Sequence, residues 1–146
     1  MPASVVDIQV ELIAHATEDL DKVLEAARAI FPPEVRDKVK FKMKSYKGHH
    51  GNPITFLRAR VRDRDLAKAI LAYIGSRLDE ASREELGRGL GRRLSGGSLF
   101  IRLDKQWASL GQLRLCASDP IWIKVRFSSS KLADIIQACR EAGLIP

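Results

Sequence analysis

The chain has 146 residues, of which 45% are hydrophobic and 29% charged, with a formal net charge of +7. This length suits a single domain, residues 1–146, that buries enough apolar surface to fold without a metal or a set of disulfides. The two cysteines, Cys116 and Cys139, have no disulfide-scaffold or metal-ligand spacing. No apolar stretch approaches the ~20 residues of a membrane span, and no signal-peptide pattern opens the chain, so we expect a cytoplasmic protein without a membrane partner.

The basic residues are concentrated in one segment. Between Glu34 and Arg64 there are ten basic and three acidic residues, an excess that equals the net charge of the whole chain. A basic block on a neutral body favours a surface that binds polyanions. A solvated charged hairpin would give the same composition and stays open as the alternative.

The N-terminal part reads as a strand followed by a helix. Val5–Ile13 alternates apolar and polar residues, the period of a half-buried strand. Thr17 offers an N-cap for a helix whose apolar positions, from Leu20 to Ile30, recur at helical spacing. Pro32 and the proline after it then end the helix.

Two strands with basic alternation follow. Lys38–Ser45 and Ile54–Arg62 each alternate apolar with basic residues, and a glycine-containing loop, Gly48–Pro53, joins them. An antiparallel pairing that puts the apolar sets on one face puts every basic side chain on the other. Because like charges so placed repel, a sequence selected only for stability would be expected to mix signs there. The cations concerned are Lys38, Lys40, Lys42, Lys44, Arg58, Arg60 and Arg62.

Two helices come next. Asp63 opens the first, whose apolar positions continue to Ile74, and Gly75 weakens its end. Ser82 and Glu85 form a capping-box pattern for a short second helix, which the glycines after it end.

The C-terminal third predicts three strands and a helix. Ser98–Asp104, Gln112–Cys116 and Ile121–Phe127 alternate, and Ser129 or Ser130 caps the last helix. The predicted order is β-α-β-β-α-α-β-β-β-α. Because strands and helices do not alternate regularly, we expect an α+β fold of two layers, a mostly antiparallel sheet with helices packed on one face.

The sheet face away from the helices would carry cations interleaved with aromatic rings. Phosphates require charge and unstacked bases require a flat apolar platform, so this composition suits single-stranded or looped RNA. The aromatic side chains could instead pack across strands or form a dimer contact, and Asp7 and Glu11 could neutralise part of the charge. The residues of the C-terminal strands concerned are Phe100, Arg102, Arg114, Trp122, Lys124 and Arg126.

No pattern supports catalysis, a metal or a cofactor. His15, His49 and His50 have no metal-ligand spacing with either cysteine. The glycines of 87–91 follow a helix and lack the Lys-Ser/Thr pair of a phosphate loop. We therefore predict no catalytic residue and no cofactor, and we leave the roles of His49 and His50 open.

Three short segments stand out by their order and spacing: His15–Asp19 with Lys22-Val23, then Gly51–Ile54, then Ile101–Gln106 with Ala108 and Leu110-Gly111. Together they resemble an archaeal family of small predicted RNA-binding proteins, described as predicted exosome subunits. The resemblance runs from about Val6 to Phe127. It implies a fold similar to the ribosomal protein that binds 5S rRNA, with RNA as the ligand. It also implies that Asn52 and Pro53 shape their loop and that Arg102, Lys105 and Gln106 contact the ligand.

The sequence thus predicts a non-enzymatic RNA-binding module acting in RNA processing, with exosome-related or ribosome-related proteins as further partners. The basic rows and Lys47 would bind phosphates, while Tyr46, Phe100 and Trp122 would stack on bases. One alternative is a scaffold subunit that dimerises, or binds an acidic partner, through the same face. Another is an RNA-modifying or RNA-cleaving enzyme that uses His49 or His50.

Overall fold

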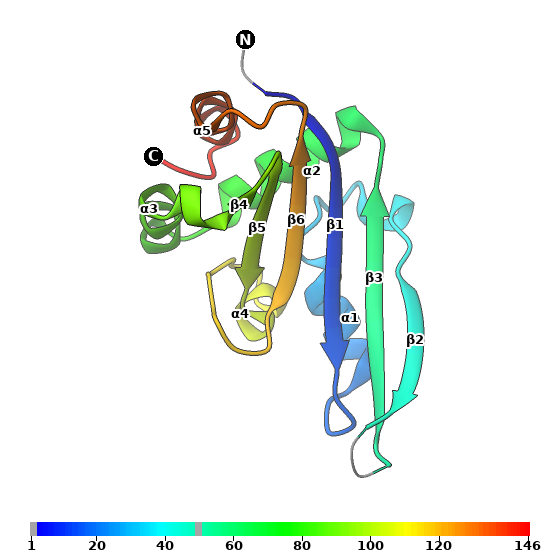
Figure 1. Cartoon of the computed structure of the whole chain (residues 1–146). Helices are drawn as coiled ribbons and strands as arrows, with labels where there is room; N and C mark the ends of the chain where they lie inside the picture. The colour runs from blue at the N-terminus through cyan, green and yellow to red at the C-terminus, as the bar shows by residue number, and fades with distance from the viewer. Residues whose placement is uncertain (1–2, 49–50) are drawn as a thin grey trace.

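The computed structural model describes residues 3–48 and 51–146 and contains a six-stranded sheet (Figure 1). The spatial order is β2-β3-β1-β6-β5-β4, and every neighbouring pair is antiparallel. The strands are β1 Val5–Ala14, β2 Lys42–Lys47, β3 Pro53–Val61, β4 Leu94–Ser95, β5 Ser98–Leu103 and β6 Ile121–Phe127.

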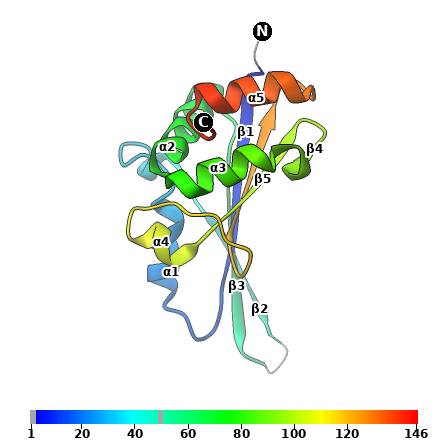
Figure 2. The same ribbon diagram turned by 90° about the vertical axis from the view of Figure 1, so that its left-hand side faces the viewer.

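The helices form the second layer. They are α1 Leu20–Arg28, α2 Arg64–Arg77, α3 Glu80–Arg88, α4 Lys105–Ser109 and α5 Leu132–Glu141, with short 3-10 turns at Arg36–Lys38 and Leu90–Arg93. Figure 2 shows α1, α2 and α4 on one side of the strands, α3 running across the β5–β4 edge and α5 across the end of the sheet. This arrangement confirms the predicted two-layer α+β fold, and no helix among residues 3–48 and 51–146 covers the other sheet face.

The core lies between the sheet and the helices. Ile8, Val10 and Leu12 of β1 are fully buried against that layer, as are Ile70 and Ile74 of α2. Each such side chain contributes about 1.5–3 kcal/mol when it is removed from water. The period-two pattern of β1 therefore fixes which of its faces is buried and which is left open.

Aspartates cap α1 and α3 in place of the predicted hydroxyl residues, whereas Asp63 caps α2 as predicted. Asp19 caps α1 in place of Thr17, and its carboxylate accepts a hydrogen bond from the Asp21 backbone N–H at 2.9 Å. Asp79 caps α3 by accepting from the N–H of Ser82. Ser82 is thus inside the helix, where its hydroxyl is buried. At the start of α5 the cap residue is Lys131, whose N–H donates to the Ser129 hydroxyl.

Two predicted strands differ from the structure. β2 begins at Lys42 because the 3-10 turn Arg36–Lys38 precedes it and Val39 is buried in the core, so Lys38 and Lys40 lie before the strand. The segment Gln112–Cys116 is not a strand and makes only isolated bridges, Leu113 with Leu78 and Leu115 with Leu103. The short strand β4 and helix α4 were not predicted.

Within the described part of the chain, no helix is both long and apolar enough to cross a membrane.

Candidate nucleic-acid interface

Strand register aligns basic and aromatic side chains across the uncovered face. Arg58 of β3 pairs with Lys42 of β2 on one side and with Glu11 of β1 on the other. Glu11 also pairs with Trp122 of β6, which pairs with Arg102 of β5. Residues directly opposite in an antiparallel sheet share a face. Lys42, Arg58, Glu11, Trp122 and Arg102 therefore form one continuous row over five strands.

A second row runs parallel to the first. Gln9 of β1 pairs with Arg60 of β3 and with Lys124 of β6, and Lys124 pairs with Phe100 of β5. The Lys124 ammonium lies 5.9 Å from the centre of the Phe100 ring, within cation–π range. The two rows bring together side chains that the sequence separates by more than a hundred positions.

Three exposed rings surround a hollow in this face. Phe56, Phe100 and Trp122 are 46%, 45% and 39% exposed. With Gln9 and Glu11 they line a depression of about 370 Å³. Phe56 was not among the predicted site residues, although its period-two relation to Arg58 would have placed it on this face.

Tyr46 extends the aromatic surface toward the edge of the sheet. It lies on β2, where its ring meets that of Phe56 edge to face with 5.4 Å between centres. The Lys44 ammonium is 5.2 Å from the centre of the Tyr46 ring. Lys44 pairs with Phe56 across the strands, so the edge strand adds both charge and aromatic surface to the open face.

Asp7 forms hydrogen bonds with two arginines of the uncovered sheet face. The residue is only 2% exposed, and its Oδ2 accepts hydrogen bonds from Arg60 at 3.1 Å and from Arg126 at 2.8 Å. Burial alone would raise the pKa of Asp7, but the hydrogen bonds from Arg126 and Arg60 outweigh it and hold the pKa below its usual value. Asp7 therefore stays charged near neutral pH and fixes both guanidinium groups.

The face remains cationic after this pairing. Glu11 lies 2.9 Å from the Arg58 Nε and is the second carboxylate that the strands place here. The strands contribute two carboxylates against seven cations. The cations are Lys42, Lys44, Arg58, Arg60, Arg102, Lys124 and Arg126.

Four predicted phosphate contacts lie around this face and not within it. Lys38 and Lys40 are exposed before β2, and Arg62 is exposed directly after β3. Lys47 is exposed at the end of β2, on the side opposite to Lys44.

Three other predicted contacts lie away from the open face. Arg114 is not on a strand: its guanidinium stacks on Trp107 of α4 at 3.5 Å from the ring centre, and its Nε is 3.7 Å from Asp79. Gln106 is exposed on α4 and borders a groove next to α1. Lys105, the third, is buried with 8% exposure.

Lys105 uses its ammonium inside the protein. The Nζ atom donates to the Ile13 carbonyl at 2.7 Å and to Glu18 at 3.0 Å, and it lies 2.9 Å from Asp119. These partners connect the end of β1, the start of α1 and the loop before β6. The structure thus gives the Lys105 ammonium a stabilising role within the fold.

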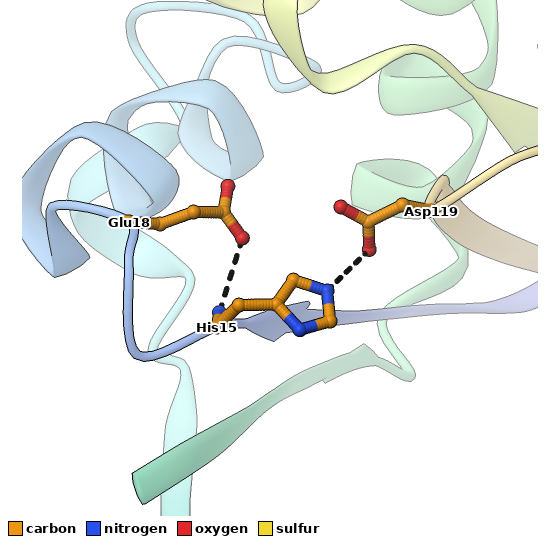
Figure 3. A group of neighbouring side chains, drawn as sticks. All are labelled: His15, Glu18 and Asp119. Atoms are coloured by element: carbon orange, nitrogen blue, oxygen red, sulfur yellow. Dashed lines mark hydrogen bonds and ion pairs between the residues drawn. The ribbon is translucent and has the colours of Figure 1, made fainter. Parts of the chain in front are cut away.

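The same carboxylates form the one group in the described residues that could hold a metal ion (Figure 3). Glu18 accepts from the His15 backbone N–H, and the His15 Nε2 lies 3.0 Å from Asp119. The Lys105 ammonium already pairs with both carboxylates, so we assign this cluster to stability. His49 and His50, whose roles were left open, lie outside the described residues.

Comparison with known proteins identifies the family. A family model described as RNA binding matches residues 7–128, from β1 through β6. The chain belongs to this RNA-binding family. An RNA-binding protein of Pyrococcus abyssi is 31% identical over 140 residues, covering 92% of this chain and 91% of that protein.

Solved structures of archaeal proteins share the fold of this RNA-binding family member. One from Archaeoglobus fulgidus superimposes with a TM-score of 0.78 at 31% identity and covers 95% of this chain and 99% of its own. Another, from Methanothermobacter thermautotrophicus, has a TM-score of 0.75 at 28% identity, with 94% and 97% covered. The resemblance to an archaeal RNA-binding family is therefore confirmed at the level of the family.

Proposed function

We propose that this chain is a non-catalytic RNA-binding protein that binds RNA through the uncovered face of its sheet. We also propose that residues 1–146 form a single RNA-binding domain. The observation that carries the proposal is the row Lys42, Arg58, Glu11, Trp122 and Arg102, which puts three cations and an aromatic ring on a sheet face that no described helix covers. Membership of the RNA-binding family supports the same ligand.

Two kinds of cation would bind phosphate. Lys42 and Lys44 are exposed ammonium groups on the edge strand. Arg60 and Arg126 are already fixed by Asp7, yet their side chains remain 37% and 48% exposed. Because a guanidinium has five N–H donors, those not used by Asp7 stay available to phosphate oxygens at little further cost in side-chain entropy.

The surrounding residues would widen this interface. Lys38, Lys40, Lys47 and Arg62 add charge beside the face, and Tyr46 adds a ring. The proposal does not include Lys105, Gln106 and Arg114, because the first two lie on α4 and the Arg114 guanidinium stacks on Trp107 of the same helix.

A second part of the proposal concerns where the protein acts in the cell and with which partners. From the family resemblance we propose cytoplasmic RNA processing, with exosome-related or ribosome-related proteins as partners. Crosslinking in cells of the source organism, followed by sequencing of the attached RNA and identification of the co-purified proteins, tests this extension separately.

Salt dependence of binding tests the interface. Lys42→Ala with Lys44→Ala removes two exposed cations from the face, and Lys22→Ala with Lys68→Ala removes two exposed cations from helices α1 and α2. Each lost phosphate contact on a single strand lowers the magnitude of the log-affinity against log-salt slope by about 0.7. We expect a decrease of about 1.4 for the first pair and none for the control pair. Equal slopes in both double variants would remove β2 from the interface.

A protein interface is the second candidate, favoured by the three exposed rings. Large exposed apolar patches often mark association sites. If Phe56, Phe100 and Trp122 seat a second copy, light scattering will show a dimer that persists at high salt and dissociates in Trp122→Lys. A monomer across ionic strengths contradicts this candidate.

A further inference from the structure

The hollow in the open face has an unusual distribution of charge. Its walls are the rings of Phe56, Phe100 and Trp122, which come from three different strands. Glu11, on the central strand β1, lies between them, and its side chain remains 42% exposed. A cationic face that only bound phosphates would not need a carboxylate at its centre.

The Glu11 carboxylate at the centre of the hollow would keep the phosphates of a bound strand away from the centre. A negative charge repels phosphate, whereas Lys42 and Arg102 lie at the two ends of the first row and Lys124 lies at the border of the hollow beside Phe100. The backbone of a bound strand is thus directed toward the rim. The group directed toward the centre must be flat, apolar on its faces and able to donate a hydrogen bond at its edge.

An unpaired base meets these requirements. Bases of single strands stack on aromatic side chains, while those of a duplex are already stacked on one another. The hollow, at about 370 Å³, lies within the range of sites that take small flat ligands. Arg58 Nε occupies one acceptor position of Glu11, and a carboxylate has about four, so others remain for a ligand.

The exocyclic amine is the base group that a carboxylate recognises. Glutamate accepts from the N4 amine of cytosine, and the amines of adenine and guanine are donors of the same kind. Uracil carries carbonyl oxygens at the corresponding positions and would face the carboxylate with an acceptor.

We propose, on the basis of the RNA-binding function above, that this hollow binds one unpaired base bearing an exocyclic amine, and that Glu11 accepts the hydrogen bond from that amine. The protein would then prefer single-stranded RNA and discriminate against uracil at one position. Phe56 and Trp122 would supply the stacking surfaces, and the surrounding cations would bind the flanking phosphates.

Ten-nucleotide oligo(C) and oligo(U) test the proposal most directly, because both pyrimidines stack weakly. The wild-type protein should bind oligo(C) about 5-fold to 100-fold more tightly than oligo(U). Glu11→Gln should bring this ratio close to one, because the amide can accept from the cytosine amine and can also donate to the uracil carbonyl oxygen. Glu25→Gln removes the same charge from an exposed position of α1 and should leave the ratio unchanged.

Fluorescence locates the bound base. The chain has two tryptophans, so Trp107→Phe leaves Trp122 as the single reporter and keeps a ring under Arg114. Oligo(C) should quench this fluorescence, whereas a ten-residue abasic ribose-phosphate chain should bind more weakly and quench little.

The outcomes separate this proposal from the broader one. If oligo(C), oligo(U), the abasic chain and a ten-base-pair duplex bind alike, phosphate binding stands and base recognition is refuted. A C-over-U ratio that Glu11→Gln does not alter also refutes the role of Glu11. If none of these probes binds at low salt, the RNA-binding function itself fails. A salt-resistant dimer that shields Trp122 before RNA is added would overturn the proposal in favour of a protein interface.

Discussion

The stabilising role of the buried Lys105 ammonium can be tested directly by substitution. Lys105→Met keeps the length and apolar stem of the side chain but removes the ammonium. All three ammonium donors have partners in the structure, the Ile13 carbonyl, Glu18 and Asp119, at 2.7 to 3.0 Å. The variant should therefore be folded but less stable.

The loss can be estimated partner by partner. A part-buried carbonyl left without its donor costs about 1–3 kcal/mol. The side chains of Glu18 and Asp119 are 31% and 43% exposed, so water replaces much of their interaction and each contributes only about 0.5–1 kcal/mol. Relief from burying the ammonium offsets part of this sum. We expect a loss of about 2–3 kcal/mol, which lowers Tm by about 5–10 °C in a protein of this size.

Urea unfolding followed by circular dichroism measures this loss, with Lys22→Met as an exposed control on α1. Burial alone would raise the pKa of Asp119, but hydrogen bonds from Lys105 and His15 hold it below its usual value. The contribution of this ion pair is therefore present above about pH 4 and is lost as pH falls through the lower folded pKa. A variant within 0.5 kcal/mol of the wild type at pH 7 would refute this reasoning, and a loss of RNA affinity in the folded variant would restore Lys105 to the interface.

Two further substitutions test other contacts. Asp7→Asn should lower the free energy of unfolding by about 1–2 kcal/mol at pH 7, because an amide pairs less strongly with Arg60 and Arg126. Since the pKa of Asp7 in the folded protein is lowered, the difference between variant and wild type in urea unfolding should shrink below about pH 4. A difference that stays constant with pH would contradict the pairing. Gly75→Ala would stabilise an isolated helix by about 1 kcal/mol, but here the added Cβ meets the backbone at Ala142, after α5. Thermal unfolding should therefore show a net loss of stability of about 1–3 kcal/mol. A stabilised variant would mean that α5 shifts easily.

Periodicity was sufficient to predict the layers and the faces of the long strands. The alternation in β1 separates Ile8 from Gln9 in the structure as it does in the sequence, and the arginines at 58 and 60 share a face with Lys42. These are local properties, since residues two apart in a strand point the same way whatever the partner strand is. The uncovered basic face follows from them once the helices pack on the other side.

Tertiary contacts decide what periodicity could not. Leu113 and Leu115 alternate as in a strand, but this segment makes only isolated bridges to the end of α2 and to β5. The burial of Lys105 depends on Glu18, which lies 87 positions away. Helix α4 was within reach of local reasoning, because Asp104 is an N-cap that accepts from the N–H three residues later, at Trp107.

The position of β1 in the middle of the sheet has a consequence for how the protein is made. One of its edges pairs with β3, but the other pairs with β6, whose residues are translated more than a hundred positions later. During synthesis, that edge has no native neighbour until Ile121–Phe127 leaves the ribosome. The nascent chain therefore lacks the β6 part of the open sheet face, including Trp122, until these residues are synthesised, and the continuous row across β1, β6 and β5 cannot form before then.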